Sequence, residues 1–225
     1  MRIRTILLSV FVLLIAAGMM QAQPKANKKA KGPKTTTVKL FNGKNLKNWE
    51  FHLRDASVDP ATVFTAANGV IRIKGEPFGY MRTKEVYSDY LLHVEWRYPT
   101  EATNSGVFVH AQLPDTIWLR TFECQLKAGN AGDFVCMNGA TMNEKKGNSI
   151  VVPKMAASSE KATGEWNSMV VTCKENTIEV SVNGVLQNRG TGISESKGHI
   201  CLQSEGKNIE FRNVYITKNP QGRRK

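Results

Sequence analysis

The amino-acid sequence predicts an all-β sandwich of two antiparallel sheets. Short segments in which apolar and polar residues alternate recur along the chain. Turn signals such as Asn138-Gly139 and Asn183-Gly184 separate these segments. Apart from an apolar run near the N-terminus, no long stretch has the spacing of an amphipathic helix. With 225 residues, 41% of them hydrophobic, the chain is long enough for one domain with a full core.

The predicted strands follow one another with short connections. In chain order they span 70–73, 90–98, 106–111, 121–126, 168–173, 177–182, 199–204 and 209–216. Asn183-Gly184 lies between two alternating runs and is the clearest hairpin signal, because both residues tolerate the positive φ of a tight turn. We therefore expect neighbouring strands to pair in an antiparallel manner.

The net charge of +12 comes from the two ends of the chain. Residues 1–37 hold seven Lys and Arg, residues 218–225 hold four, and neither end contains an acid. Since the whole chain has 31 basic and 19 acidic residues, residues 38–217 carry 20 basic and 19 acidic ones. A nearly neutral domain is a poor match for a phosphate backbone, so we expect no nucleic-acid partner.

The N-terminal segment has the order of residues of a secretory signal peptide. Arg2 and Arg4 precede an apolar run over 6–17, and small residues lead to Ala22. We expect cleavage after Ala22, a periplasmic or otherwise secreted location, and no stable membrane insertion of the mature chain. The alternative is an uncleaved anchor, although the run is shorter than the roughly 20 residues that span a bilayer.

The rest of the chain divides into three parts by composition. Residues 23–37 form a Lys-rich flexible linker, residues 38–217 the folded domain, and residues 218–225 a basic tail. The domain contains all four cysteines, which are Cys124, Cys136, Cys173 and Cys201. They lie in apolar or alternating segments and lack metal-binding spacing, so we favour buried free thiols over disulfides.

Ionisable and amide side chains alternate with apolar ones in several predicted strands. If these strands share one sheet, the polar residues meet on one surface. They are Glu95, Arg97, His110, Glu123, Gln125, Gln203 and Glu205. The alternative is a solvated sheet face without a function, which antiparallel sandwiches often have.

Several phrases of the sequence resemble those of a known family, in the same order. They are LFNGKNLKNW at 40–49, NSGVFV at 104–109, ECQ at 123–125, GEWN at 164–167, NGV at 183–185, LQSEG at 202–206 and EFRNVYI at 210–216. Together they are similar to the 3-keto-disaccharide hydrolase family, formerly a domain of unknown function. The chain departs from the family pattern at His110, where Arg is frequent, and at Glu205, where His is frequent.

This resemblance implies a concanavalin A-like jelly roll and an exported 3-keto-glycoside hydrolase or 1,2-lyase. Its substrate is then a 3-keto-glucoside or a related oligosaccharide. A ketone at C3 acidifies the hydrogen on C2, so a base can remove it, and collapse of the enolate expels the aglycone from C1. Water then adds to the unsaturated product, or this product is released without hydration. A divalent metal ion is the expected cofactor, because it stabilises an enolate.

The implied roles fall on the polar residues named above and on two residues of a glycine-rich loop, 127–134. The catalytic candidates are Glu95, His110 and Glu123. The metal-ligand candidates are His110, Glu123 and Glu205. The substrate-binding candidates are Arg97, Gln125, Asn130, Asp133, Gln203 and Glu205. For the loop, an ordinary connection between strands is the alternative.

Two alternatives concern the function and the mechanism. A non-catalytic carbohydrate-binding module or lectin uses the same kind of sandwich, but the predicted polar face has few of the aromatics that such modules expose. Trp118 either stacks on a sugar or fills the core. If cleavage does not proceed through C2, a paired-carboxylate mechanism with Glu95 and Glu123 is the alternative.

Overall fold

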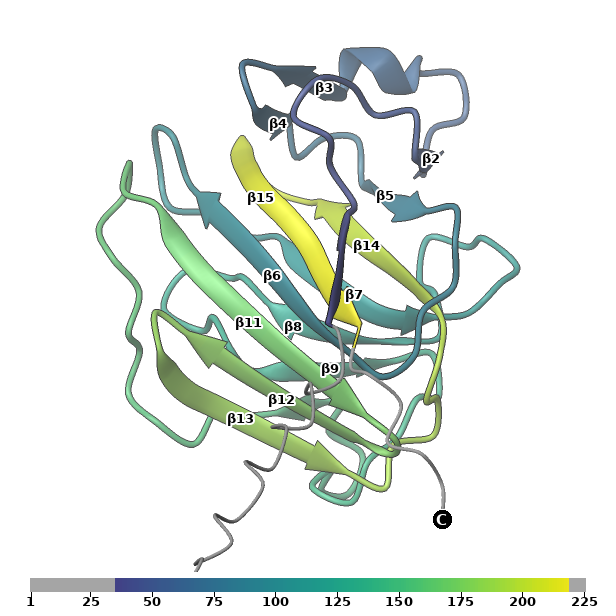
Figure 1. Ribbon diagram of the computed structural model, residues 1–225, viewed down its shortest axis with the longest axis vertical. Helices are drawn as coiled ribbons and strands as arrows, with labels where there is room; N and C mark the ends of the chain where they lie inside the picture. Colours follow the sequence, from purple (N-terminus) through teal and green to yellow (C-terminus); the bar gives the residue numbers. More distant parts are fainter. Residues whose placement is uncertain (1–34, 219–225) are drawn as a thin grey trace, which may run out of the picture. The chain divides into compact units, whose positions relative to one another are not determined.

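Two antiparallel sheets make up almost all of the part that the structure, a computed structural model, describes, which is residues 35–218 (Figure 1). Sheet A has the order β13 (Val185–Thr191), β12 (Thr177–Val182), β11 (Asn167–Lys174), β6 (Tyr90–Arg97), β15 (Ile209–Lys218), β4 (Val70–Ile73) and β3 (Phe64–Ala67), and β1 (Thr36–Lys39) also pairs with β15. Sheet B has the order β10 (Val151–Val152), β9 (Phe134–Met137), β8 (Thr121–Gln125), β7 (Gly106–Ala111), β14 (His199–Ser204), β5 (Gly79–Thr83) and β2 (Trp49–Leu53). One short 3₁₀ helix, η1 (Pro60–Thr62), precedes β3. This arrangement confirms the predicted sandwich.

The main core lies between the inner faces of the two sheets. In β6, alternate residues Leu92, Val94 and Trp96 are fully buried, as the sequence pattern predicts. Phe122 and Phe134 of sheet B belong to the same cluster. Burial of each such side chain stabilises the fold by about 2 kcal/mol. The predicted hairpin is also present, because Asn183 and Gly184 have positive φ angles of 49° and 83° between β12 and β13.

The outer face of sheet B is covered to a large extent. A second apolar cluster lies on it, made of Tyr80, Phe108, Ala111, Leu119, Val135, Met137 and Cys201. The loop 112–120 packs over this cluster and is held there by Asp115, which accepts hydrogen bonds from Tyr80 Oη and Arg82 Nε, each at 2.9 Å. Polar side chains on this face are therefore shielded from water.

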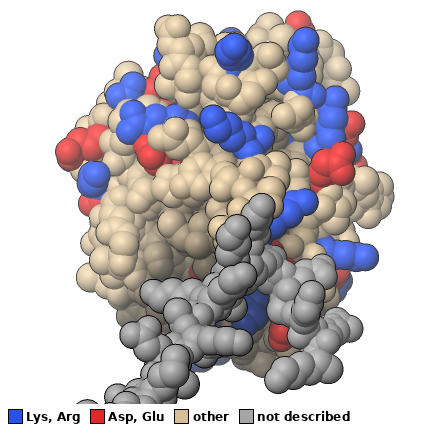
Figure 2. All heavy atoms as spheres, viewed as in Figure 1, with Lys and Arg blue, Asp and Glu red and all other residues tan. Residues whose placement is uncertain are grey.

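The outer face of sheet A has a different character. Figure 2 views the molecule from this side and shows Lys and Arg side chains among Asp and Glu side chains. Arg97 and Arg72 both pair with Glu210, at 2.7 and 2.9 Å. Arg212 pairs with Glu95 at 2.5 Å. Within each pair, the opposite charges on neighbouring strands neutralise each other.

The ends of the ordered domain differ slightly from the predicted boundaries. Thr36 and Thr37, assigned to the linker, begin β1, and Lys218, assigned to the tail, ends β15. The pairing of Thr36 with Lys218 explains both shifts, because each end supplies backbone hydrogen bonds to the other. The predicted signal peptide over 1–22 lies outside the described residues and stays a prediction.

The cysteines agree with the sequence-based expectation. All four are buried and free. Burial raises the pKa of the Cys136 thiol to about 11 and that of Cys173 to about 12, so both remain protonated and unreactive at neutral pH. Within residues 35–218, no helix has the length and apolar character needed to cross a membrane.

Candidate functional site

Three of the phrases quoted above, NSGVFV, ECQ and LQSEG, come together at one end of the outer face of sheet B. Asn104 precedes β7, Glu123 lies in β8, and Gln203 and Glu205 lie at the end of β14. Backbone contacts fix the segment before β7 between its neighbours, since Ser105 Oγ donates to the carbonyl of Gln203 at 2.9 Å. We call Asn104, Glu123, Gln203 and Glu205 the carboxylate cluster.

Glu123 is the most strongly perturbed acid of the carboxylate cluster. Its side chain projects from the outer face of sheet B, where its strand neighbours are Phe108 and Val135, and only 4% of the residue is exposed. Burial raises the pKa of Glu123 to about 8, and the nearby charge of Glu205 adds to the shift. Glu123 is therefore mainly protonated at neutral pH.

Gly106 provides the space for this carboxyl group. It pairs with Gln125 across the β7–β8 ladder, and a Cβ atom built on Gly106 would lie 2.2 Å from Glu123 Oε1. Any larger residue at this position would collide with the carboxyl group, because real Cβ atoms do not approach so closely. The glycine of the NSGVFV phrase is thus a steric requirement of the site.

Glu205 is a second acid with a raised pKa. Burial is the largest cause, and it is opposed by hydrogen bonds from Asn104 and Gln203 and by the charges of Arg54 and Lys127. Glu205 thus has donors and cations that favour its ionised form, whereas Glu123 has none. Neighbouring carboxyl groups in such different surroundings can divide the roles of acid and base between them.

Several hydrogen-bond acceptors of the carboxylate cluster have no donor in the part of the chain that the structure describes. They are Asn104 Oδ1, Glu123 Oε1 and Gln203 Oε1, all three buried. Buried acceptors are normally paired, and leaving one unpaired costs about 1–3 kcal/mol. A ligand with several hydroxyl groups would supply the missing donors, so the cluster suits a sugar.

Glu95 and Arg97 do not lie near this cluster. Both belong to β6, which is part of sheet A, so the condition under which all seven polar residues would meet on one surface is not met. Glu95 bonds Arg212 and Asn213, and Arg97 bonds Glu210. Burial tends to raise the pKa of Glu95, but the hydrogen bonds outweigh it and lower the pKa. Alternation predicted outward-facing side chains correctly but could not tell which sheet holds the strand.

His110 is also separated from the carboxylate cluster, because a β-bulge turns it into the core. Three steps along β7, from Phe108 to Ala111, lie opposite two steps along β14, from Cys201 to His199. His110 has a positive φ of 56°, packs edge-on against the buried Tyr90 ring, and bonds the carbonyl of Glu195 through Nδ1 at 2.7 Å. Burial lowers the pKa of His110 to about 4, so the imidazole is neutral.

The predicted metal-ligand set therefore does not form. Glu123 and Glu205 lie close enough to influence each other, but His110 points to the inside of the sandwich. Among residues 35–218, no group of three or more His, Cys, Asp or Glu side chains is arranged to hold a metal ion. The residues present do not fit a bound cation, and the divalent ion stays a prediction without a ligand set.

The remaining substrate-binding candidates stabilise the chain locally. Gln125 Oε1 accepts from the backbone N–H groups of Leu126 and Lys127 at 2.9 and 2.8 Å. Asp133 accepts from Asn130 Nδ2 at 3.2 Å and from the Lys154 N–H at 2.8 Å. These bonds shape the loop 127–134, which agrees with its alternative interpretation as a connection between strands.

Two neighbours of Glu205 were not among the sequence-based candidates. Asn104 is the first residue of the NSGVFV phrase, and its position there was the available signal. Arg54 follows β2 and no motif marks it, because its nearness to Glu205 arises only from the pairing of β2 with β5. Trp118 is 46% exposed, so it does not fill the core.

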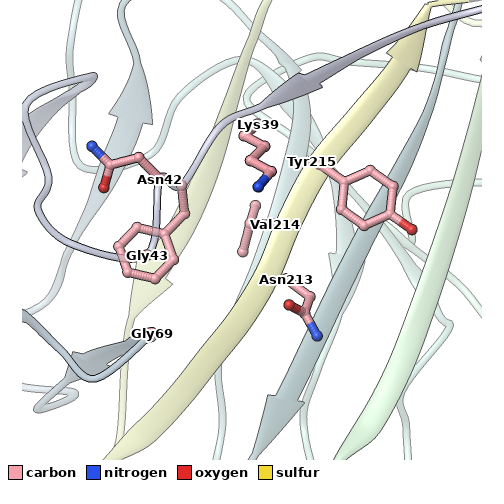
Figure 3. A pocket seen from close by; sticks show the side chains of 8 residues that line it. Lys39, Asn42, Gly43, Gly69, Asn213, Val214 and Tyr215 are labelled. Atoms are coloured by element: carbon pink, nitrogen blue, oxygen red, sulfur yellow. The ribbon is translucent and has the colours of Figure 1, made fainter.

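Three cavities in the described part of the chain lie away from the carboxylate cluster. A cavity of about 170 Å³ lies where β1 meets β15 and is lined by Lys39, Asn42, Asn213 and Tyr215, among others (Figure 3). The residues that line it include no acid. The side chains labelled in Figure 3 belong to residues 39–42 and to residues 213–215 of β15. Larger cavities, of about 310 and 500 Å³, lie beside β4 and beside β10. We place the candidate site at the carboxylate cluster, because within residues 35–218 this is where acids with raised pKa values coincide with unpaired acceptors.

Solved structures share this fold at low sequence identity. A candidate glycosyl hydrolase from Parabacteroides distasonis has a TM-score of 0.61 at 23% identity, over 82% of this chain and 100% of that one. A β-glucanase from Bacillus licheniformis has a TM-score of 0.57 at 14% identity, over 84% and 100%. The carbohydrate-binding module CBM66 from Bacillus subtilis has a TM-score of 0.55 at 8% identity, over 74% and 93%. No match was found among curated proteins.

The sequence itself matches one protein family. The profile of the 3-keto-alpha-glucoside-1,2-lyase-like domain covers residues 36–217, which is the whole sandwich from β1 to β15. This match confirms the family resemblance, and the structural likeness to the glucanase and to the binding module confirms the jelly-roll fold. The chain therefore belongs to the 3-keto-alpha-glucoside-1,2-lyase-like family and is a carbohydrate-active jelly-roll protein.

Proposed function

We propose that this protein cleaves 3-keto-glycosides by elimination, with Glu205 as the base and Glu123 as the acid. The observation that carries the proposal is the buried Glu123 carboxyl group, whose pKa of about 8 keeps it protonated beside a second carboxyl group. The family match supports the substrate class. The proposal moves the base from Glu95 and His110, which the structure places elsewhere, to the carboxylate cluster.

The proton and electron balance of the reaction needs only these two groups. Glu205 takes the C2 proton that the C3 ketone acidifies, and the electron pair of the C2–H bond forms the enolate. The enolate then re-forms the ketone and a C1–C2 double bond, the C1–O bond breaks, and Glu123 gives its proton to the departing oxygen. Addition of water across the double bond would complete a net hydrolysis, and release of the unsaturated ketone would be a lyase reaction.

The unpaired acceptors of Asn104 and Gln203 orient the keto sugar in this proposal. Each can accept a hydrogen bond from a sugar hydroxyl group, which fixes the ring relative to the base. Their amide groups also hold Glu205, so ligand binding and positioning of the base use the same side chains. A periplasmic location remains part of the proposal, as the sequence predicts it, whereas the proposed steps use no divalent ion.

The test compares a 3-keto-glucoside with the unoxidised glucoside in deuterated water. The proposal expects cleavage of the keto compound alone, with deuterium appearing at C2 of the recovered substrate or of the hydrated product. Glu123→Gln and Glu205→Gln should each lower the rate by about 100-fold or more, since each removes a proton-transfer group. Glu101→Gln, a change at an exposed position, is the control. Cleavage without C2 exchange or a C2 isotope effect would contradict the elimination mechanism.

A non-catalytic carbohydrate-binding role is the second candidate. The exposed Trp118 favours it, because binding modules often use exposed aromatic side chains to hold sugars. The likeness to CBM66 shows only that the fold is compatible with such a role. A binding module would bind the 3-keto-glucoside without cleaving it. Neither the wild type nor Glu123→Gln would then show any turnover.

A further inference from the structure

We infer that Arg54, Phe78 and Trp118 form a subsite for the leaving group, next to the base Glu205; this inference rests on the proposed function. The occupant is a ring that presents a flat apolar face, which is either a second sugar or an aromatic aglycone. We call these three residues the aromatic subsite. Neither the family match nor the fold assigns a role to them.

The three side chains form a contiguous surface. The Arg54 guanidinium lies 4.5 Å from the centre of the Phe78 ring and 6.0 Å from that of Trp118. The two rings are 6.1 Å apart at an interplanar angle of 60°. Arg54 and Phe78 are the residues just beyond the paired ends of β2 and β5, and the Arg54 N–H donates to the Phe78 carbonyl at 2.7 Å. The strand pairing therefore fixes one half of the subsite.

The other half is fixed by the loop 112–120. Asp115 ties this loop to Tyr80 and Arg82 of β5, as described above, and Tyr80 Oη also donates to the carbonyl of Thr116 at 3.1 Å. Thr116 Oγ1 donates to the Trp118 carbonyl at 3.0 Å. Trp118 is nevertheless 46% exposed, whereas Leu119 of the same loop is only 1% exposed. The loop thus presents the indole to solvent on a fixed support.

The position of the subsite relative to the acids identifies its occupant. Ser204 pairs with Gly79, and Gly79 pairs with Leu53, so Glu205, Phe78 and Arg54 follow one another at the ends of three neighbouring strands. The aromatic subsite therefore lies beside the carboxylate cluster, and the charge of Arg54 opposes the rise in the pKa of Glu205. The keto sugar must occupy the cluster itself, because only there can its C2 proton meet the base. The next group along the glycoside is the one attached at C1, which leaves in the reaction. A flat ring at that place can stack on Trp118, which favours substrates whose leaving group is itself a ring.

The experiment uses three substrates with the same 3-keto-glucosyl group and different leaving groups: glucose, p-nitrophenol and methanol. Trp118→Ala should raise KM by about three- to tenfold for the two ring leaving groups and leave the methyl glycoside within about twofold. A larger effect on p-nitrophenol than on glucose identifies an aromatic aglycone as the occupant, and the reverse identifies a sugar. Leu113→Ala, at an exposed position of the same loop, is the matched control and should leave KM unchanged for all three substrates.

Equal effects of Trp118→Ala on all three substrates, or no effect on any, would overturn the subsite. Failure of the wild-type protein to cleave any of the three would instead contradict the proposed function. In that case, calorimetry of the 3-keto-disaccharide with Glu123→Gln still tests the subsite. Weaker binding after the added Trp118→Ala change supports it, and equal affinity overturns it.

Discussion

Glu123 owes its protonated state to burial, which no donor opposes among the described residues. Glu95 is also partly shielded from water, yet its pKa is lowered, because Arg212 and Asn213 bond it directly. The two glutamates show that burial alone does not set the pKa of an acid; the partners of the charged form decide its direction. Only Glu123 is thereby suited to give a proton at neutral pH.

The contrast between these glutamates predicts different results for the same substitution. Glu95→Gln should leave turnover of a 3-keto-glucoside within about twofold and lower the melting temperature, because it weakens the contact with Arg212. Glu123→Gln should abolish most of the turnover. Parallel kinetics and thermal melts of both variants test this difference. A large loss of rate in Glu95→Gln would indicate that Glu95 of sheet A is the catalytic base.

Gly106 offers a second test at the scale of one residue. Gly106→Ala should displace the Glu123 carboxyl group, since the new methyl group would lie 2.2 Å from Oε1. We expect at least about a tenfold loss of rate and a loss of about 1–3 kcal/mol in the free energy of unfolding. Denaturant titration and initial rates measure the two effects.

A double variant separates displacement from general damage. In Gly106→Ala/Glu123→Ala the colliding side chain is absent, so stability should recover relative to Gly106→Ala while the rate stays low. If stability did not recover, the methyl group would act on the backbone and not on Glu123.

At the scale of elements, alternation identified the main strands and their inward faces, such as Leu92, Val94 and Trp96 in β6. It could not assign strands to sheets, because β6 and β8 alternate in the same way and differ only in their partners. Such partners are distant in sequence, and no local pattern encodes them. The structure therefore brings Glu123, Gln203 and Glu205 together and places Glu95 in the other sheet, and the roles of these residues stay predictions.

The bulge in β7 explains the second error. Alternation assumes one residue per step, and the extra residue in β7 reverses the direction of the side chain that follows. His110 therefore faces Tyr90 in the core although the pattern predicts an outward direction. The sequence gives no turn residue or glycine at this position that would indicate the bulge. The strands β2, β3, β9 and β10 were not predicted, because each has only two to five residues, too few to show a clear alternation.

The edge strand β1 carries a prediction about truncation. A chain that starts at Thr35 keeps β1 and its pairing with β15, so its melting temperature should equal that of a longer chain. A chain that starts at Leu40 loses the pairs of Thr36 to Lys39 and the packing of Val38 on the core. We expect its melting temperature to fall by about 5 °C or more. Equal melting temperatures for both chains would mean that β1 adds no stability.

At the scale of the whole molecule, the outer faces of the two sheets differ in the surroundings of their acids. On the outer face of sheet A, acids pair with partly exposed Arg side chains, whereas on sheet B Glu123 is buried and its Oε1 has no partner among the described residues. Charges in water interact weakly, and shielded ones strongly. The acids of the candidate site with raised pKa values, Glu123 and Glu205, lie on the sheet B side, and a site placed there gains the larger electrostatic effect.

The same division predicts how stability depends on pH. The pKa of Glu123 is raised from 4.5 to about 8 in the folded state, so the unfolded state loses this proton first. Stability should therefore fall as the pH rises from about 4.5 to 8. The pKa of His110 is lowered from 6.5 to about 4, so the unfolded state gains its proton first. This group makes stability fall as the pH drops from about 6.5 to 4.

Two variants separate these opposing contributions. Glu123→Gln removes the first, so its unfolding free energy, measured by denaturant titration, should exceed that of the wild type more at pH 8.5 than at pH 5. His110→Asn removes the second and keeps a residue type that tolerates positive φ, so its curve should be flatter than that of the wild type between pH 6.5 and 4. Curves that ran parallel to the wild type in both variants would mean that neither group is perturbed by its burial, and the proposed acid would then lose its physical basis.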